Sequence, residues 1–107
     1  MTDTLTSTHR QGTLTAGQLQ TEIDYALTEI LAEDGTVQQL GISQDDMTSV
    51  HIKVEGEGGF DPGTVLLTIA LWLVAGMTEE AGKILLKKVL EKVKKRCGDD
   101  ALGDPEE

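Results

Sequence analysis

The chain has 107 residues, which is enough for one small domain with a thin core. Hydrophobic residues make up 38% of the chain and aromatic residues only 3%, so the core must be aliphatic. Nineteen acidic residues against nine basic residues give a net charge of −10, which argues against a general nucleic-acid binder because such proteins need a basic surface. The single cysteine excludes an internal disulfide and is typical of a reducing compartment, so we expect a cytoplasmic protein.

The first part of the chain predicts a polar arm followed by an amphipathic helix. Residues 1–14 are rich in threonine and have no apolar periodicity, so we expect a flexible arm. Thr15 and Gln18 match a capping box, and the residues from Leu19 to Leu31 place their apolar side chains on one helical face. We therefore expect the folded domain to begin at residue 15 and to extend to residue 98.

One strand is predicted near the middle of the chain. Residues 48–55 alternate, with Val50, Ile52 and Val54 on one face and charged side chains or histidine on the other. A single strand leaves its backbone groups unpaired, so it needs a partner strand. Three partners fit the sequence: residues 11–15 of the arm, a second copy of the chain, or another protein that adds a strand. We assign Val50, Ile52 and Val54 to an interaction surface.

The most apolar segment follows a helix-start pattern at Asp61 and Pro62. Residues 62–78 hold 17 positions without a formal charge, which predicts an apolar helix over residues 62–77. At about 25 Å, such a helix lies at the short limit for crossing a membrane. We expect it to be buried against a partner, with a homo-oligomer as one outcome. The side chains assigned to that interface are Leu67, Leu71, Trp72 and Val74.

A basic amphipathic helix is predicted after Thr78, which is placed to cap it. Seven of the nine basic residues lie within residues 83–96, and only one acidic residue is found there. This basic face either pairs with acidic side chains of the first helix or meets an anionic membrane or an acidic partner protein. Residues 99–107 form an acidic tail. The basic side chains assigned to interaction are Lys87, Lys88, Lys94, Lys95 and Arg96.

No set of side chains in the sequence predicts catalysis. His9 lies in the arm and His51 on the exposed face of the strand, and neither has the cysteine or histidine neighbours of a zinc site. Cys97 ends an apolar stripe, so we expect a buried structural thiol and not a nucleophile. We therefore expect a protein that is not an enzyme and that has no metal or cofactor.

Three segments carry a resemblance to known proteins. Residues 48–54, residues 58–62 and residues 94–103, with the apolar segment between them, resemble small uncharacterised bacterial proteins found beside effector or conflict-system genes. The resemblance implies an accessory role in the cell and carries over no site residues.

These patterns together predict an α+β fold that is mainly α. Its elements are an amphipathic helix, one short strand that needs a partner, an apolar helix and a basic amphipathic helix. The function that we expect is a non-enzymatic interaction or accessory module that binds itself or another protein. The alternative is a membrane-active effector that inserts residues 62–77 and lays its basic helix on anionic lipid.

Overall fold

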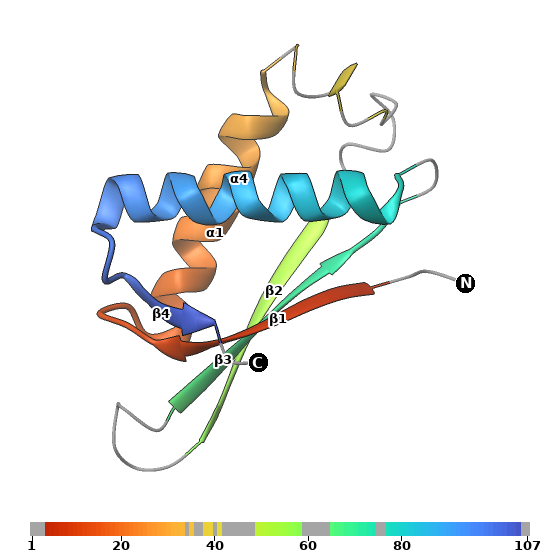
Figure 1. Ribbon diagram of the computed structural model, residues 1–107. Helices are drawn as coiled ribbons and strands as arrows, with labels where there is room; N and C mark the ends of the chain where they lie inside the picture. Colours follow the sequence, from red (N-terminus) through yellow and green to blue (C-terminus); the bar gives the residue numbers. More distant parts are fainter. Residues whose placement is uncertain are drawn as a thin grey trace.

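The computed structural model describes residues 4–33, 35, 38–39, 41, 49–58, 65–74 and 77–105. Within these residues the chain forms four strands and two long helices, which alternate as β, α, β, β, α, β (Figure 1). In chain order they are β1 (Thr4–Gln11), α1 (Ala16–Leu31), β2 (His51–Gly58), β3 (Val65–Trp72), α4 (Glu79–Cys97) and β4 (Leu102–Pro105).

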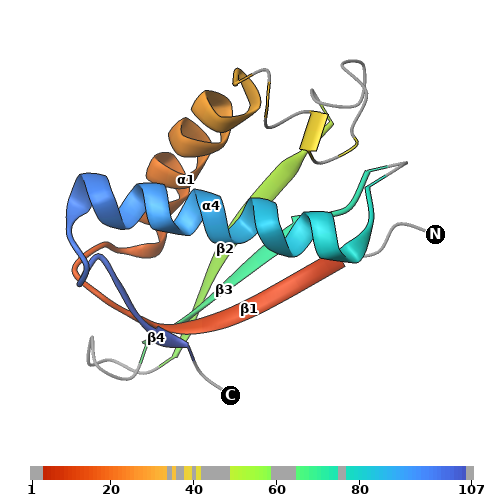
Figure 2. The same cartoon turned by 45° about the horizontal axis from the view of Figure 1, so that its top comes forward.

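The four strands form one sheet in the order β2-β3-β1-β4, and every neighbouring pair is antiparallel. β1 and β2 are therefore parallel to each other across β3, and α1 connects them. In the same way α4 connects β3 to β4 across β1. Two interleaved split β-α-β units of this kind define the ferredoxin-like topology. Both helices lie on the same side of the sheet, and no described helix covers the other side (Figures 1 and 2).

The expectation of a mainly α fold with one short strand is wrong, because the sheet has four strands. The predicted strand is present as β2, and its partner is a strand of the same chain: Ile52 pairs with Leu71 and Val54 with Ile69 of β3. The part of the arm that includes Thr4–Gln11 is also a strand, β1, but it pairs with β3 and not with β2. Leu102–Pro105, assigned to the acidic tail, forms β4.

The predicted apolar helix over residues 62–77 is also wrong, because Val65–Trp72 is the strand β3. This strand has a neighbour on each edge, and Leu67, Ile69 and Leu71 are fully buried under the helices. The alternate side chains are only partly buried on the helix-free face. A continuous apolar run does not distinguish a buried helix from a central strand by periodicity alone. The expected helix start at Asp61 and Pro62 lies outside the described residues.

Both amphipathic helices are confirmed, together with the residues that begin them. The Thr15 hydroxyl accepts a hydrogen bond from the Gln18 amide at 3.3 Å, and the Gln18 side chain accepts one from the Thr15 amide at 3.0 Å. At the start of α4 the Thr78 hydroxyl accepts from the Ala81 amide at 3.1 Å. α4 ends at Gly98, whose φ of 107° lies in the left-handed region that favours glycine.

A single aliphatic core fills the space between the sheet and the two helices. α1 contributes Leu19 and Ile23, which are fully buried, and α4 contributes Leu85 and Val89, which are buried to the same extent. These side chains pack on the inward face of the sheet, where the fully buried residues are Ile52, Leu67, Ile69 and Leu71. The two helices therefore cover one face of the most apolar strand, β3.

Candidate functional site

The basic side chains of α4 lie on two sides of that helix. One group faces α1 and the other faces β1, so the basic face expected from the sequence is divided between two grooves. The group beside α1 consists of Lys88, Lys92, Lys95 and Arg96, and the group beside β1 consists of Lys83, Lys87 and Lys94.

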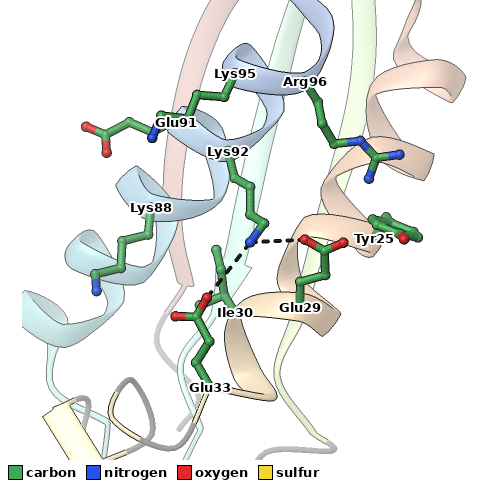
Figure 3. A pocket seen from close by; sticks show the side chains of 9 residues that line it. All are labelled: Tyr25, Glu29, Ile30, Glu33, Lys88, Glu91, Lys92, Lys95 and Arg96. Atoms are coloured by element: carbon green, nitrogen blue, oxygen red, sulfur yellow. Dashed lines mark ion pairs between the residues drawn. The ribbon is translucent and has the colours of Figure 1, made fainter.

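The groove between the two helices, here the interhelical groove, has a volume of about 530 Å³ and is lined by side chains of both charges (Figure 3). Lys92 points across it toward α1, and its ammonium lies 3.0 Å from a carboxylate oxygen of Glu29 on α1 and 3.9 Å from one of Glu33, which follows that helix. The hydrogen bond and charge of Lys92 lower the pKa of Glu29. Lys92 therefore links α4 to α1 within the chain.

Arg96 makes a second link between the helices. Its guanidinium carbon lies 4.1 Å from the centroid of the Tyr25 ring, which is a cation–π contact, and its Nε lies 3.6 Å from a Glu22 carboxylate oxygen. The expectation that the basic helix pairs with acidic residues of the first helix is thus confirmed at Lys92 and Arg96. The interhelical groove already contains partners for these two charges.

The remaining reactive groups of the described residues give no indication of catalysis. Burial raises the pKa of the Cys97 thiol, and Glu22 beside it acts in the same direction. A raised pKa keeps the thiol protonated at neutral pH, which is unlike an activated nucleophile. Within the described part of the chain, no three side chains of the metal-binding types lie together.

A second groove, the β1–α4 groove, runs between β1 and α4 and has a volume of about 510 Å³. Its apolar lining comes from Leu5 of β1 and from Leu86 and Leu90 of α4. The three lysines of α4 that face β1 surround this lining. Ser7 and His9, which follow Leu5 on the same face of β1, continue the groove along the strand.

His9 is the one buried polar side chain among the described residues, with 7% of its surface exposed. Its Nε2 lies 2.7 Å from the Ser7 hydroxyl, whereas its Nδ1 makes no hydrogen bond of normal geometry with the described residues. Burial lowers the pKa of His9, and the charge of Lys94 acts in the same direction; the nearby backbone of Gly103 opposes the shift. An unpaired polar atom in a buried position costs free energy unless a ligand or solvent reaches it.

The outer edge of β1 is open beside this groove. β4 has four residues, and it pairs with β1 only at His9 and Gln11, with an irregularity between them. No described residue pairs with the outer edge of Thr4–Thr8, although β3 pairs with the inner edge over the same length. The outward backbone groups of these five residues are therefore without a strand neighbour in the described structure.

At the opposite edge of the sheet, a side chain occupies part of the outer edge of β2. The amide of Gln20 on α1 donates a hydrogen bond to the Ile52 carbonyl at 2.8 Å and accepts one from the Val54 amide at 2.6 Å. A glutamine side chain thus occupies the position that a further strand would take beside β2. The two edges of the sheet differ in this respect.

Most of the apolar side chains assigned to an interface lie in the core. Val50, Ile52, Val54, Leu67 and Leu71 are buried within the chain. Because the two helices cover them, they are not accessible to a partner. Val74 is partly buried against the core, and Trp72 lies on the helix-free face, stacked on His51 with ring centroids 5.6 Å apart.

The sequence assignments missed the β1 side of the candidate groove. Leu5, Ser7 and His9 belong to the segment that we expected to be a flexible arm. The signal for a strand was present, because threonine is β-branched and alternates there with Leu5, Ser7 and His9. One apolar residue in that stretch was too weak a periodicity to show it.

The membrane alternative required a helix over residues 62–77, but Val65–Trp72 within that range is the strand β3. No helix within the described residues has both the length and the apolar character needed to cross a bilayer.

Comparison of the chain with protein-family models, with curated proteins and with solved structures gives no match. The resemblance to bacterial effector-associated proteins therefore stays a prediction.

Proposed function

We propose that this protein is a non-enzymatic interaction module that accepts an extended segment of another polypeptide as an additional strand. The observation that carries the proposal is the open outer edge of Thr4–Thr8, which lies beside the β1–α4 groove. The role is an accessory one, and the single cysteine favours a cytoplasmic setting.

An added strand satisfies the backbone groups that the short β4 leaves unpaired. Open strand edges are templates for pairing with another chain, and main-chain hydrogen bonds then contribute affinity. Five residues of β1 provide a template about 17 Å long, at roughly 3.3 Å per residue. The incoming segment would extend the sheet in line with β4.

The groove supplies what a bare strand edge lacks, namely contacts that select side chains. Alternate residues of an added strand point to the side of the sheet that carries the helices. There they would meet Leu86 and Leu90 of α4, together with Leu5 of β1. Backbone pairing and side-chain selection are thus combined at one place.

The experiment is a selection of random twelve-residue peptides displayed on phage against the full chain, followed by mapping of the selected peptides. Amide hydrogen exchange and chemical shifts are measured with and without each peptide. We expect alternate amides within Thr4–Thr8 to gain protection, and Leu86 and Leu90 to shift. Peptides that bind only at the helix-free face or the interhelical groove, or a selection that returns no binder, would contradict the proposal.

A further inference from the structure

We infer that the segment accepted at the β1–α4 groove is an acidic extended peptide with an apolar residue between its acidic ones. This inference rests on the proposed strand addition and names the chemistry of the partner. Three features of the groove carry it: the charges on its rim, the order of side chains along α4, and the polar ring of His9 in its lining.

The rim of the groove carries three lysines and one glutamate, Glu91, so positive charge is in excess there. Lys87 and Lys94 make no ion pair or hydrogen bond with any described residue, in contrast to Lys92 and Arg96 on the other side of the helix. Lys83 has only an exposed contact of 3.6 Å with Glu79. In a chain with a net charge of −10, unpaired cations around an apolar groove favour an acidic ligand.

Charged and apolar side chains are interspersed along this face of α4. The side chains of α4 that line the groove are, in order, Lys83, Leu86, Lys87, Leu90, Glu91 and Lys94. The twelve residues from Lys83 to Lys94 rise by about 17 Å, which is close to the length of a five-residue strand. An added strand therefore meets a lysine at each end of the groove, and Leu86, Lys87 and Leu90 between them.

His9 adds a polar contact inside the groove. The Nε2 of His9 lies 2.7 Å from the Ser7 hydroxyl, and the backbone of Gly103 interacts with the same ring. His9 therefore adds a polar group to the lining beside the lysines, and a carboxylate or backbone carbonyl of an added segment is an acceptor for a ring N–H.

A second copy of the chain fits this site less well than an acidic partner. Antiparallel pairing of two β1 edges about a two-fold axis would bring the lysines of both copies to the same place. Like charges brought together in this way oppose association. The chain's own Glu106 and Glu107 follow β4 in sequence and are a further competitor; both lie outside the described residues.

The test uses a capped seven-residue peptide of sequence Thr-Glu-Thr-Val-Thr-Glu-Thr, and two relatives in which glutamine or lysine replaces glutamate. Binding to the full chain is measured by calorimetry, and the site by amide exchange of Thr4–Thr8. We expect the glutamate peptide to bind at least about tenfold more tightly than the glutamine peptide, with this preference decreasing as salt is added. The lysine peptide should not bind.

Two double variants provide a matched comparison on one helix. Lys87→Glu with Lys94→Glu reverses charge in the β1–α4 groove, whereas Lys88→Glu with Lys95→Glu makes the same change on the side facing α1. We expect the first to lose binding of the glutamate peptide and the second to retain it. If the first pair fails to fold, Lys87→Gln with Lys94→Gln replaces it. Equal losses from the two sides of α4 would overturn the inference.

The remaining outcomes separate the inference from the proposal on which it rests. If the glutamate and glutamine peptides bind equally and both protect Thr4–Thr8, strand addition stands and the acidic partner is wrong. If no peptide protects these amides, both are wrong. A dimer that the glutamate peptide dissociates would identify a second copy as the occupant. Binding that appears only after Glu106→Lys and Glu107→Lys would identify the chain's own end, and either result would overturn the inference.

Discussion

At the scale of single residues, two side chains determine how each edge of the sheet is used. Gln20 reaches from α1 to β2 and hydrogen-bonds one outward-facing carbonyl and one outward-facing amide of that strand. His9 is buried on β1, where its Nε2 lies 2.7 Å from the Ser7 hydroxyl. The edge of β2 is therefore capped at Ile52 and Val54, whereas Thr4–Thr8 of β1 has no strand neighbour on its outer edge among the described residues.

Replacing Gln20 tests whether its amide blocks the edge of β2. Gln20→Ala removes the two partly buried hydrogen bonds to Ile52 and Val54 of β2. We expect the free energy of unfolding to fall by about 1–3 kcal/mol. Asp24→Ala is the matched control, because it removes only the exposed contact of 3.0 Å to the Gln20 side chain. Urea denaturation of both variants measures the difference. An equal, small effect of the two substitutions would show that the bridge to β2 contributes little.

The buried imidazole of His9 predicts how stability depends on pH. Burial lowers its pKa from the ordinary value of 6.5, so below that value the unfolded chain binds a proton more readily than the folded chain. The free energy of unfolding should therefore decrease as the pH falls from 6.5 toward the pKa of folded His9. Above that range both states hold His9 neutral, so this residue causes no loss of stability there. Urea denaturation across this range should show a smaller decrease in His9→Gln than in the wild type. His51→Gln serves as the control, and an identical loss of pH dependence in both variants would contradict this account.

At the scale of secondary-structure elements, the two helices and β2 could be predicted from sequence, and the other strands could not. Capping residues and apolar periodicity mark α1 and α4, and alternation marks β2. β3 was not predicted as a strand because neither of its faces carries a charge. Its outer face holds partly buried residues such as Ala70 and Trp72, so the segment lacks the apolar–polar alternation that marks a half-exposed strand. β4 has four residues and includes glycine and proline, so no pattern marks it.

Paired substitutions in β3 distinguish the strand from the helix that the sequence suggested. Leu71→Asp places a charge among fully buried side chains, and we expect it to unfold the protein, at a cost above about 4 kcal/mol. Ala70→Asp places the same charge on the helix-free face beside Lys53 of β2, so the fold should persist. Circular dichroism during thermal unfolding measures both. Equal damage from these neighbouring substitutions would contradict the strand.

At the scale of the whole molecule, the fold separates charges that the sequence had grouped together. The sequence predicted one basic face over residues 83–96. In the structure, Lys92 and Arg96 form ion pairs with acidic residues of α1, whereas Lys87 and Lys94 lie beside β1. The sequence indicated pairing between the two helices as one of two outcomes, but it did not single out Lys92, which makes the shortest ion pair. The β1–α4 groove could not be predicted from the sequence, because one of its sides is β1 and the sequence predicted a flexible arm there.

The central claim is that the outer edge of Thr4–Thr8 is open in the free protein. Amide hydrogen exchange, at a concentration where light scattering shows a monomer, tests this most directly. Within Thr4–Thr8 the amides that face β3 should exchange slowly, and the alternate, outward amides should exchange rapidly. We expect this alternation to end toward His9, where β4 begins to pair with β1. Slow exchange of every amide from Thr4 to Thr8 would mean that the edge is already covered, and would rule out strand addition there.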